Sequence, residues 1–264
     1  MDLQLKGKCA LVTGSTAGIG FAAARLLAAE GARVVINGRQ QDRVDSAART
    51  IRETISGADV RGIPADLATA QGCSELTAQL PEVDVLVNNV GVFEPKAFEE
   101  ITDRDWMRFF ETNVLSGVRL SRHYLPGMRA RNWGRIVFVS SESAVQIPVE
   151  MIHYGMTKTA QLAIARGLAE TTIGSGVTVN SVLPGPTASE GVSTFVSQMA
   201  ESRGIDFKTM EREFFSTARP SSLLQRFASP DEVAAMIVYV CSAAASATNG
   251  AALRVDGGVV RSIL

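Results

Sequence analysis

Short apolar segments alternate with longer segments of helical periodicity along almost the whole chain. The apolar segments are rich in Val and Ile, and Gly, Pro, Asn or Asp bounds them. Their apolar positions are continuous rather than alternating, which is typical of strands buried on both faces of a parallel sheet. We predict seven strands, at residues 9–12, 33–36, 60–63, 83–87, 135–139, 177–182 and 251–255.

The segments between these strands repeat their apolar residues at helical spacing. We predict helices at about residues 18–31, 41–55, 69–79, 103–130, 152–173 and 230–245. Alternation of strand and helix over residues 1–264 indicates a single α/β domain with a doubly wound parallel sheet, covered by helices on both faces. No linker, internal repeat or low-complexity tract marks a second domain.

The stretch between Pro184 and Pro230 contains no predicted strand. It carries Pro, Gly and Ser residues around a helical centre at about residues 193–215. Long insertions of this kind in compact domains are usually functional or disordered, and this one follows the carboxyl end of a strand. We therefore predict a substrate lid at about residues 186–219, with a peripheral helical hairpin as the alternative.

Composition excludes several classes of protein. The chain has 264 residues, of which 46% are hydrophobic and 20% charged, as in a globular domain. Lys and Arg number 26 against 27 Asp and Glu, so a nucleic-acid partner is not expected. No apolar run is long enough for a membrane span, and no signal peptide is visible at the start. We expect a cytoplasmic protein.

Cysteine and histidine indicate no metal site. Cys9, Cys73 and Cys241 are far apart and form no CxxC pair, so each is expected to be a small buried hydrophobe. The two histidines, His123 and His153, are too few and too separate for a histidine-based metal site.

A glycine cluster follows the first strand and opens the first helix. The glycines Gly14, Gly18 and Gly20 have the spacing G-x-x-x-G-x-G, with Ser15, Thr16 and Ile19 between them. Glycine allows a tight turn and a close backbone approach to a pyrophosphate, and the helix start offers free N–H groups. A glycine turn can also join strand to helix without a ligand, so this signal alone is weak.

The second strand runs into Asn37, Gly38 and Arg39. A carboxylate at this point would bind the ribose 2′-hydroxyl of NAD, whereas a guanidinium pairs with the 2′-phosphate of NADP. Arg39 therefore favours NADP(H) over NAD(H), the alternative being a solvated loop arginine. Asp66, followed by Leu67 after the third strand, is a candidate acceptor for the adenine amino group or the N-cap of the next helix.

Polar residues that could carry chemistry follow the fourth and fifth strands. Tyr154 and Lys158 are four residues apart at the start of a predicted helix, so they share one face. We expect the ammonium to lower the pKa of the phenol, which suits a general acid/base. Ser141 lies just beyond the fifth strand, and Asn113 lies inside a predicted helix, where Asn is a poor former.

Together these residues resemble the short-chain dehydrogenase/reductase family over nearly the whole chain. The matching motifs are Thr13–Gly20, Asn88–Gly91, Asn113, Ser141, Tyr154-x-x-x-Lys158, Pro184-Gly185 and Asp256-Gly257-Gly258. Val90 stands where the family usually has Ala, and Ser189 where it often has Thr. The resemblance implies a Rossmann-like seven-stranded sheet and a closed homo-oligomer, which we expect to be a homotetramer.

The resemblance also implies the site residues. Asn113, Ser141, Tyr154 and Lys158 would form a catalytic tetrad, in which Tyr154 exchanges a proton with the substrate oxygen and Asn113 holds a water. The expected cofactor contacts, besides Tyr154 and Lys158, are Gly14, Ser15, Thr16, Gly18, Ile19, Gly20, Asn37, Arg39, Asp66, Leu67, Asn89, Gly91, Pro184, Gly185, Thr187 and Ser189.

The implied function is hydride transfer between NADP(H) and a carbonyl or secondary alcohol, as in 3-oxoacyl reductases or ketone reductases. The alternatives are an NAD(H)-dependent alcohol dehydrogenase and, less favoured, a non-catalytic NADP(H)-binding sensor. An epimerase or dehydratase on the same fold also remains open. The substrate is not determined by the sequence, because fold and family do not set it. Candidates to line its pocket are Glu94, Gln146, Ile147, Phe214 and Phe215.

Overall fold

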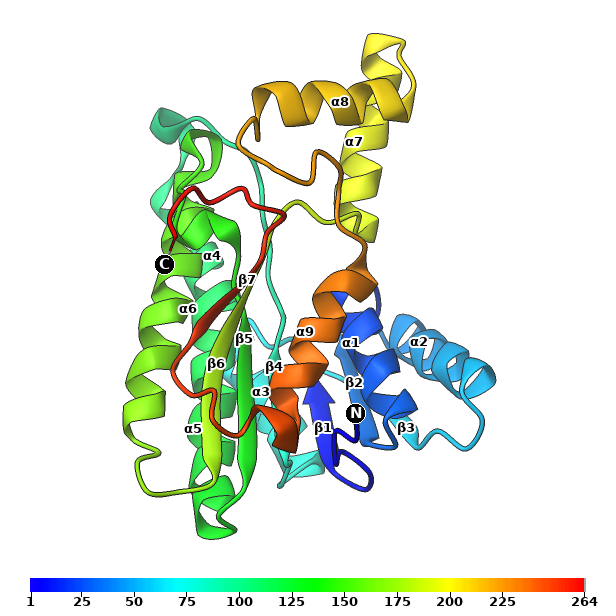
Figure 1. Ribbon diagram of the computed structural model, residues 1–264, viewed down its shortest axis with the longest axis vertical. Helices are drawn as coiled ribbons and strands as arrows, with labels where there is room; N and C mark the ends of the chain where they lie inside the picture. The colour runs from blue at the N-terminus through cyan, green and yellow to red at the C-terminus, as the bar shows by residue number, and fades with distance from the viewer. Residues whose placement is uncertain (264) are drawn as a thin grey trace.

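The structure, a computed structural model, describes residues 1–263 and contains one seven-stranded sheet (Figure 1). All neighbouring strands pair in parallel, in the order β3-β2-β1-β4-β5-β6-β7. This arrangement confirms the predicted doubly wound α/β fold. The strands are β1 Cys9–Val12, β2 Arg33–Gly38, β3 Val60–Pro64, β4 Val85–Asn88, β5 Gly134–Val139, β6 Val177–Pro184 and β7 Ala252–Val255.

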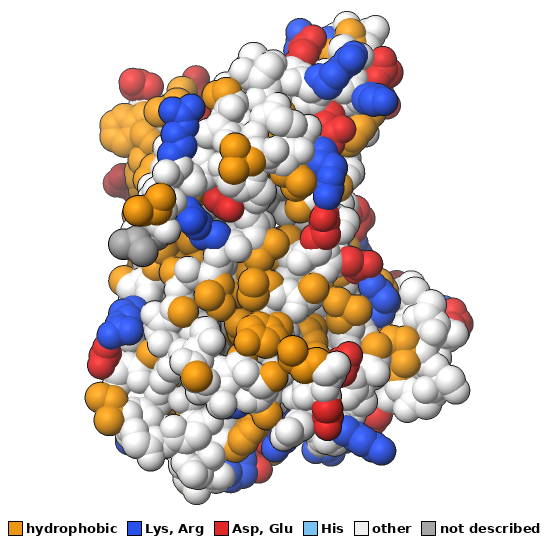
Figure 2. Space-filling view, viewed as in Figure 1, with side chains coloured by type: hydrophobic (Ala, Val, Ile, Leu, Met, Phe, Trp, Pro, Cys, Tyr) orange, Lys and Arg blue, Asp and Glu red, His pale blue; other side chains and the backbone are white. Residues whose placement is uncertain are grey.

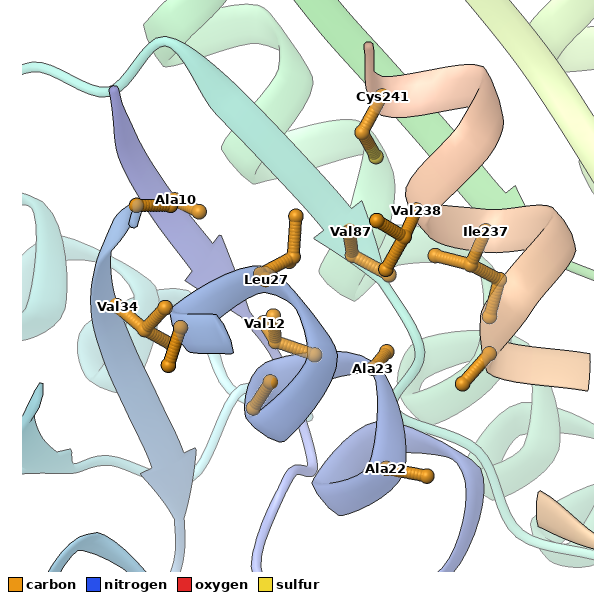
Figure 3. Packing of buried hydrophobic residues seen from close by; sticks show 14 of the residues in the cluster. Ala10, Val12, Ala22, Ala23, Leu27, Val34, Val87, Ile237, Val238 and Cys241 are labelled. Atoms are coloured by element: carbon orange, nitrogen blue, oxygen red, sulfur yellow. The ribbon is translucent and has the colours of Figure 1, made fainter. Parts of the chain in front are cut away.

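Helices cover both faces of this sheet, as the continuous apolar strands require. One face packs against α1 Gly18–Ala29, α2 Gln41–Thr54 and α9 Pro230–Cys241. The other face packs against α3 Ala70–Gln79, α5 Ser116–Ala130 and α6 Ile152–Glu170. Leu27 of α1 and Val238 of α9 lie together over Val12 of β1 in the first of these layers (Figure 3).

Two strands, β2 and β6, extend two residues further than predicted at their carboxyl ends, and their neighbours explain the difference. Asn37 and Gly38 continue β2 because they pair with Ile63 and Pro64 of β3. In β6, Pro184 is included because it pairs with Val255 of β7. Apolar pattern alone stops at the first polar residue or proline, whereas strand length is set by pairing.

The single helix predicted for residues 103–130 is wrong in one respect. The structure divides it into α4 Asp103–Phe110, a π-helical turn at Glu111–Leu115 and α5. A π turn inserts one extra residue per turn and is frequent at functional sites. Here it contains Asn113, whose side chain bonds to Val92 and Thr157, outside this helical segment.

The insertion after β6 contains two helices rather than one helical centre. They are α7 Glu190–Arg203 and α8 Phe207–Thr217, separated at Gly204, which has φ of 65°. Asp206 caps α8 by accepting a hydrogen bond from the Thr209 N–H. The helices project beyond the sheet, and charged side chains cover their outer end (Figures 1 and 2). Their small apolar cluster comprises Val196, Ala200, Met210, Phe215 and Phe227.

The cysteines match their expected role only in part. Cys73 and Cys241 are buried, but Cys9, at the start of β1, is only half-buried. All three are free, and burial raises the pKa of each thiol. No helix within residues 1–263 is long and apolar enough to cross a membrane.

Candidate active site

The candidate site lies at the carboxyl edge of the sheet, where β1, β4, β5 and β6 end beneath α7. The glycine loop occupies the end of β1 and requires glycine for two separate reasons. Gly14 and Gly18 have φ of 59° and 58°, a region that disfavours other residues. A Cβ on Gly20 would lie 2.4 Å from Asn89 Nδ2 and 2.6 Å from the Gly14 oxygen. These three positions at the junction of β1 and α1 therefore cannot carry a side chain without strain or a close contact.

Asn89 ties the end of β4 to this loop. Its Nδ2 donates to the backbone oxygens of Thr13 and Gly14, at 2.9 and 3.0 Å. The Thr13 hydroxyl accepts from the N–H groups of Asn89 and Val90, at 2.8 and 3.0 Å. The predicted cofactor residue Asn89 thus shapes the loop, since both hydrogens of its amide are used within the protein.

Three other predicted cofactor residues direct their side chains into the protein. Ser15 is fully buried and donates to the Val12 oxygen. Asn37 is also buried, and its Nδ2 donates to the oxygens of Ile63 and Ala65 at 3.1 and 3.3 Å. The Ile19 side chain packs against the core. The side chains of Ser15 and Asn37 are therefore engaged within the protein.

The end of β2 leaves a cation exposed. Arg39 is exposed and forms no hydrogen bond or ion pair with any residue of the described chain. Thr16 lies close by, because a Cβ on Gly38 would be 2.6 Å from its Cγ2. Arg43, one turn into α2, is instead paired with Glu190 of α7 at 2.8 Å. Of Arg39 and Arg43, it is therefore Arg39 that is available to bind an anion.

Asp66 does not cap the helix that follows it, so that alternative is wrong. Thr69 is the N-cap of α3 and accepts from the Gly72 N–H at 2.9 Å. Asp66 is exposed, and one of its carboxylate oxygens accepts from the Ala68 N–H at 3.1 Å. The Leu67 side chain is buried in the core.

Tyr154 and Lys158 lie one turn apart at the start of α6. The buried Lys158 ammonium donates to the Val139 oxygen at 2.9 Å and contacts Gln161 Oε1 at 3.4 Å. Its nitrogen is 5.6 Å from the centre of the Tyr154 ring. A Cβ on Gly91 would lie 3.4 Å from this nitrogen. The structure thus brings the predicted Tyr–Lys pair to the loop after β4.

Asn113 reaches the same place from the π turn. Its side chain accepts from the Val92 N–H at 2.8 Å and donates to the Val92 oxygen at 3.0 Å. It also donates to the Thr157 hydroxyl at 3.0 Å, and its backbone oxygen accepts from Gln161 Nε2 at 2.6 Å. Asn113 therefore holds the loop after β4 against α6. Gln161, which bridges Asn113 and Lys158, has no counterpart in the sequence-based prediction.

Ser141 follows β5 and is buried among polar groups. Its hydroxyl donates to Glu142 Oε2 and accepts from the Ser143 N–H at 3.1 Å. Ser140 donates to the Lys158 oxygen at 2.9 Å and so fixes the end of β5 to α6. Glu142 was not identified from the sequence. No local pattern distinguishes a carboxylate that turns inward beside a serine from one that faces solvent.

Burial controls the ionisation of the Tyr–Lys pair. It raises the pKa of Tyr154, to which the nearby Glu142 carboxylate also contributes. The Ser141 hydrogen bond and the Arg219 charge oppose this effect on the pKa. Burial lowers the pKa of Lys158 from 10.5 to about 8. The net lowering of the Tyr154 pKa expected from the sequence is thus not found in this structure, where burial dominates.

The residues after β6 form another part of the candidate site. Gly185 needs to be glycine because a Cβ there would lie 2.5 Å from the Asp256 oxygen. The buried Thr187 hydroxyl donates to the Gly185 oxygen at 2.9 Å. Ser189 faces the glycine loop, since its Cβ is 3.1 Å from where a Cβ on Gly18 would be. Gly185 therefore packs against the residue that follows β7, and Ser189 packs against the glycine loop.

The expected pocket residues divide into two groups. Phe215 is buried in the small cluster of α7 and α8, and Phe214 packs beside it, so both serve mainly in packing. Gln146 and Ile147 are exposed, and Glu94 is paired with Arg108. Sequence reasoning missed Phe93, whose ring meets Tyr154 edge-on with centroids 6.5 Å apart. The His153 ring packs on Phe109.

The cradle fits a dinucleotide. The turn that contains Gly14, Gly18 and Gly20 leads directly into the N-terminus of α1, which suits a pyrophosphate. The glycine at position 91 leaves space beside the Lys158 ammonium. Within residues 1–263, no group of three or more His, Cys, Asp or Glu side chains could hold a metal ion.

Comparison with known proteins identifies the family. The family model described as short chain dehydrogenase matches residues 8–200. The chain belongs to this family. It is therefore an oxidoreductase acting on hydroxyl or carbonyl groups, as the motifs predicted.

Several relatives span the whole of this dehydrogenase. The uncharacterized oxidoreductase YvrD of Bacillus subtilis is 49% identical, over 100% of both chains. The D-beta-hydroxybutyrate dehydrogenase of Cupriavidus necator is 33% identical over 97% of this chain and 99% of its own. The crystal structure of L-sorbose reductase from Gluconobacter frateurii, complexed with NADPH and L-sorbose, superimposes with a TM-score of 0.94. It is 34% identical, and the match covers 100% of each chain.

Proposed function

We propose that this dehydrogenase is an NADP(H)-dependent reductase of ketones that also runs in reverse on secondary alcohols. The observation that carries the proposal is the meeting of Tyr154, Lys158 and Ser141 beside the glycine loop. These groups come from α6 and from the loop after β5. Gly91, in the loop that Asn89 ties to the glycine loop, lies beside the Lys158 ammonium.

The proposed roles follow from the positions of the side chains. When bound, the nicotinamide supplies or accepts the hydride. Tyr154 gives a proton to the substrate oxygen during reduction, and Ser141 holds that oxygen. Lys158, anchored by Val139, keeps a positive charge beside the phenol. Asn113 positions the loop after β4 on the other side of Lys158.

Two observations support NADP(H) over NAD(H). No carboxylate stands at the end of β2, where one would repel a 2′-phosphate, and Arg39 is exposed there without a partner in the described chain. The L-sorbose reductase relative was crystallised with NADPH. The same relative supports a hydroxylated ketone as the first substrate class to test, with 3-oxoacyl thioesters next.

Wider features of the proposal concern the molecule as a whole. The helices α7 and α8 are proposed to cover the substrate, since Gly191 of α7 lies next to Phe93, whose ring meets the Tyr154 ring edge-on. The three free cysteines fit a reducing compartment, in line with a cytoplasmic location. We further propose a homotetramer that binds a small carbonyl or alcohol substrate and no nucleic acid.

The decisive experiment compares NADPH with NADH on the wild type and on Arg39→Ala. We expect NADPH to bind at least about tenfold more tightly, because a charge-assisted pair to the 2′-phosphate contributes roughly 1.5–3 kcal/mol. Arg39→Ala should remove that difference without weakening NADH. Binding is followed by fluorescence titration, and turnover by loss of NADPH with ketoses and simple ketones.

Arg33→Ala is the matched control, because Arg33 is an exposed arginine at the opposite end of β2. It should keep the preference for NADPH. Equal binding of NADH by the wild type would contradict the NADP(H) assignment. It would instead favour the NAD(H)-dependent alcohol dehydrogenase, and the substrate screen would start with alcohols.

A further inference from the structure

A buried ion pair adjoins the candidate catalytic serine, Ser141. Arg219 Nε donates to Glu142 Oε1 at 3.0 Å, and both side chains are at least nine-tenths buried. Arg219 follows α8, whereas Glu142 follows Ser141, so the pair joins segments 77 residues apart. A buried charge is costly unless it is paired and hydrogen-bonded, so both partners need this contact.

The other oxygen of the carboxylate is engaged by the loop after β5. Glu142 Oε2 accepts from the Ser141 hydroxyl, from the Ser143 N–H at 2.8 Å and from the Ser143 hydroxyl at 3.1 Å. Ser141 has one hydroxyl hydrogen, and this bond sets its direction. Ser141 also lowers the pKa of Tyr154, so Glu142 acts on a group that adjoins the phenol.

Arg219 in turn connects this carboxylate to the insertion. Its Nη1 donates to Glu150 Oε1 at 3.2 Å and to the Ala218 oxygen at 2.8 Å. The guanidinium lies over the ring of Phe214, 5.9 Å from its centre. Phe214 belongs to the aromatic cluster that holds α8 in place. A displacement of α8 would therefore move Arg219 and, through the ion pair, shift the Glu142 carboxylate.

We propose that Glu142 is a positioning residue for Ser141 and that Arg219 links this position to the α7–α8 segment. A change in the position of the α7–α8 segment then changes the position of the Ser141 hydroxyl, and a change at the serine likewise affects the segment. The proposal rests on the proposed function in one respect, that Ser141 turns its single hydroxyl hydrogen from Glu142 to the substrate oxygen while the Ser143 N–H still holds the Ser141 oxygen. It concerns this chain's own residues and needs no further cofactor.

Kinetic coupling tests the link to Ser141. Glu142→Gln should lower kcat roughly 10- to 100-fold, because small misplacement of a group at the reacting atoms has effects of this size. In a Ser141→Ala background the same change should lower kcat by less than about twofold, because the group it positions is gone. An equal loss in both backgrounds would show that Glu142 does not act through Ser141 and would overturn the inference.

The pH dependence of kcat for alcohol oxidation separates positioning from a merely structural role. Glu142 and Arg219 are the charged groups that act on Tyr154, with opposite signs, and the Lys158 ammonium lies close to the ring. Oxidation needs Tyr154 as a base. Glu142→Gln should therefore move the acidic limb to lower pH, and Arg219→Met should move it to higher pH. Shifts in the same direction, or none, would contradict the geometry.

Limited proteolysis tests the link to the segment and needs no substrate. Arg203, Lys208 and Arg212 are exposed trypsin sites on α7 and α8. Arg219→Met should speed cleavage at these sites at least several-fold. Glu213→Gln is the matched control, because it breaks the Arg203–Glu213 pair of 2.5 Å within the same segment and leaves Arg219 in place. Equal cleavage of both variants would overturn the link.

The double variant Glu142→Gln/Arg219→Met removes both charges together. It should recover thermal stability relative to Arg219→Met alone, since no carboxylate stays buried without its cation, yet kcat should stay low. Recovery of kcat along with stability would overturn the positioning role. A wild type without reductase activity would overturn the proposed function, whereas an active wild type whose single variants keep full kcat would overturn this inference alone.

Discussion

Opposing influences act on the Tyr154 hydroxyl. Burial and the Glu142 carboxylate raise its pKa, whereas Ser141 and Arg219 lower it. A phenol that stays protonated at neutral pH is suited to donate a proton during reduction. The same residue needs further stabilisation of its phenolate to serve as a base in oxidation.

The first prediction at the residue scale removes this hydroxyl. Tyr154→Phe should lower kcat by about 10²–10⁴-fold, the usual contribution of a general acid, while NADPH binding is retained. Steady-state kinetics and fluorescence titration measure the two effects. Tyr239→Phe is the control, because Tyr239 lies on α9 with its side chain partly exposed. Full activity in Tyr154→Phe would instead support a protein that only senses NADP(H).

The second prediction concerns Lys158. Its pKa is 10.5 when exposed and about 8 in the fold, so between these values the unfolded chain binds the proton and the folded chain does not. The free energy of unfolding should therefore rise with pH in this window for the wild type relative to Lys158→Met, by about 3 kcal/mol in all.

Urea unfolding of both proteins at pH 7 and pH 10 measures this difference. Lys158→Met should also lose activity, since it lacks the donor that bonds to Val139. Titrations of cysteine and tyrosine cancel in the comparison, because both proteins contain them. A stability difference that does not change with pH would show that the ammonium is not desolvated.

At the scale of elements, the junction between β1 and α1 is the most constrained. The helix can start directly after the loop because Gly20 has no side chain. A Cβ there would meet an amide nitrogen at 2.4 Å and a backbone oxygen at 2.6 Å. Asn89 supplies that nitrogen, so β1, β4 and α1 meet at one point.

Gly20→Ala should therefore destabilise the fold by about 1–3 kcal/mol and weaken NADPH binding, because the loop must shift. Gly191→Ala in α7 is the matched control for stability. The nearest atoms to its added Cβ belong to the Phe93 ring, at 3.8 Å, an ordinary contact. It should leave the free energy of unfolding unchanged or raise it by up to about 1 kcal/mol. Equal stability of the two variants would contradict the close packing at Gly20.

At the scale of the whole molecule, one surface stands out. A hollow between α5 and α6 is lined by apolar side chains, among them Val118, Leu125, Ile164, Leu168 and Ile173. Ile173 is 81% exposed. Exposed apolar patches of this kind often mark contacts between subunits. This surface therefore supports the proposed homotetramer.

Light scattering should give the mass of four chains for the wild type. Ile173→Arg should shift the population to dimers or monomers, because it places a charge in the proposed contact. Val149→Arg is the control, since Val149 is 82% exposed but lies outside the hollow. A wild type that stays monomeric at high concentration would refute the assembly.

Much of the fold could be predicted because it depends on local pattern. Buried parallel strands need continuous apolar runs, and helices between them need one apolar face, so both are visible in the sequence. The end of β6 and the π turn at Asn113 were missed. Strand ends depend on a partner strand, and the extra residue in the turn is fixed by bonds to Val92, Thr157 and Gln161.

The amino-acid sequence by itself determined the fold class, the family and the positions of Tyr154, Lys158, Ser141 and Asn113, because these depend on ordered motifs. Only the tertiary structure decided what surrounds them. It placed the Glu142 carboxylate against the serine and paired it with Arg219, 77 residues away. It also showed that burial, together with the Glu142 carboxylate, raises the pKa of Tyr154. Desolvation and long-range pairing depend on the packing of distant segments, which no local pattern contains.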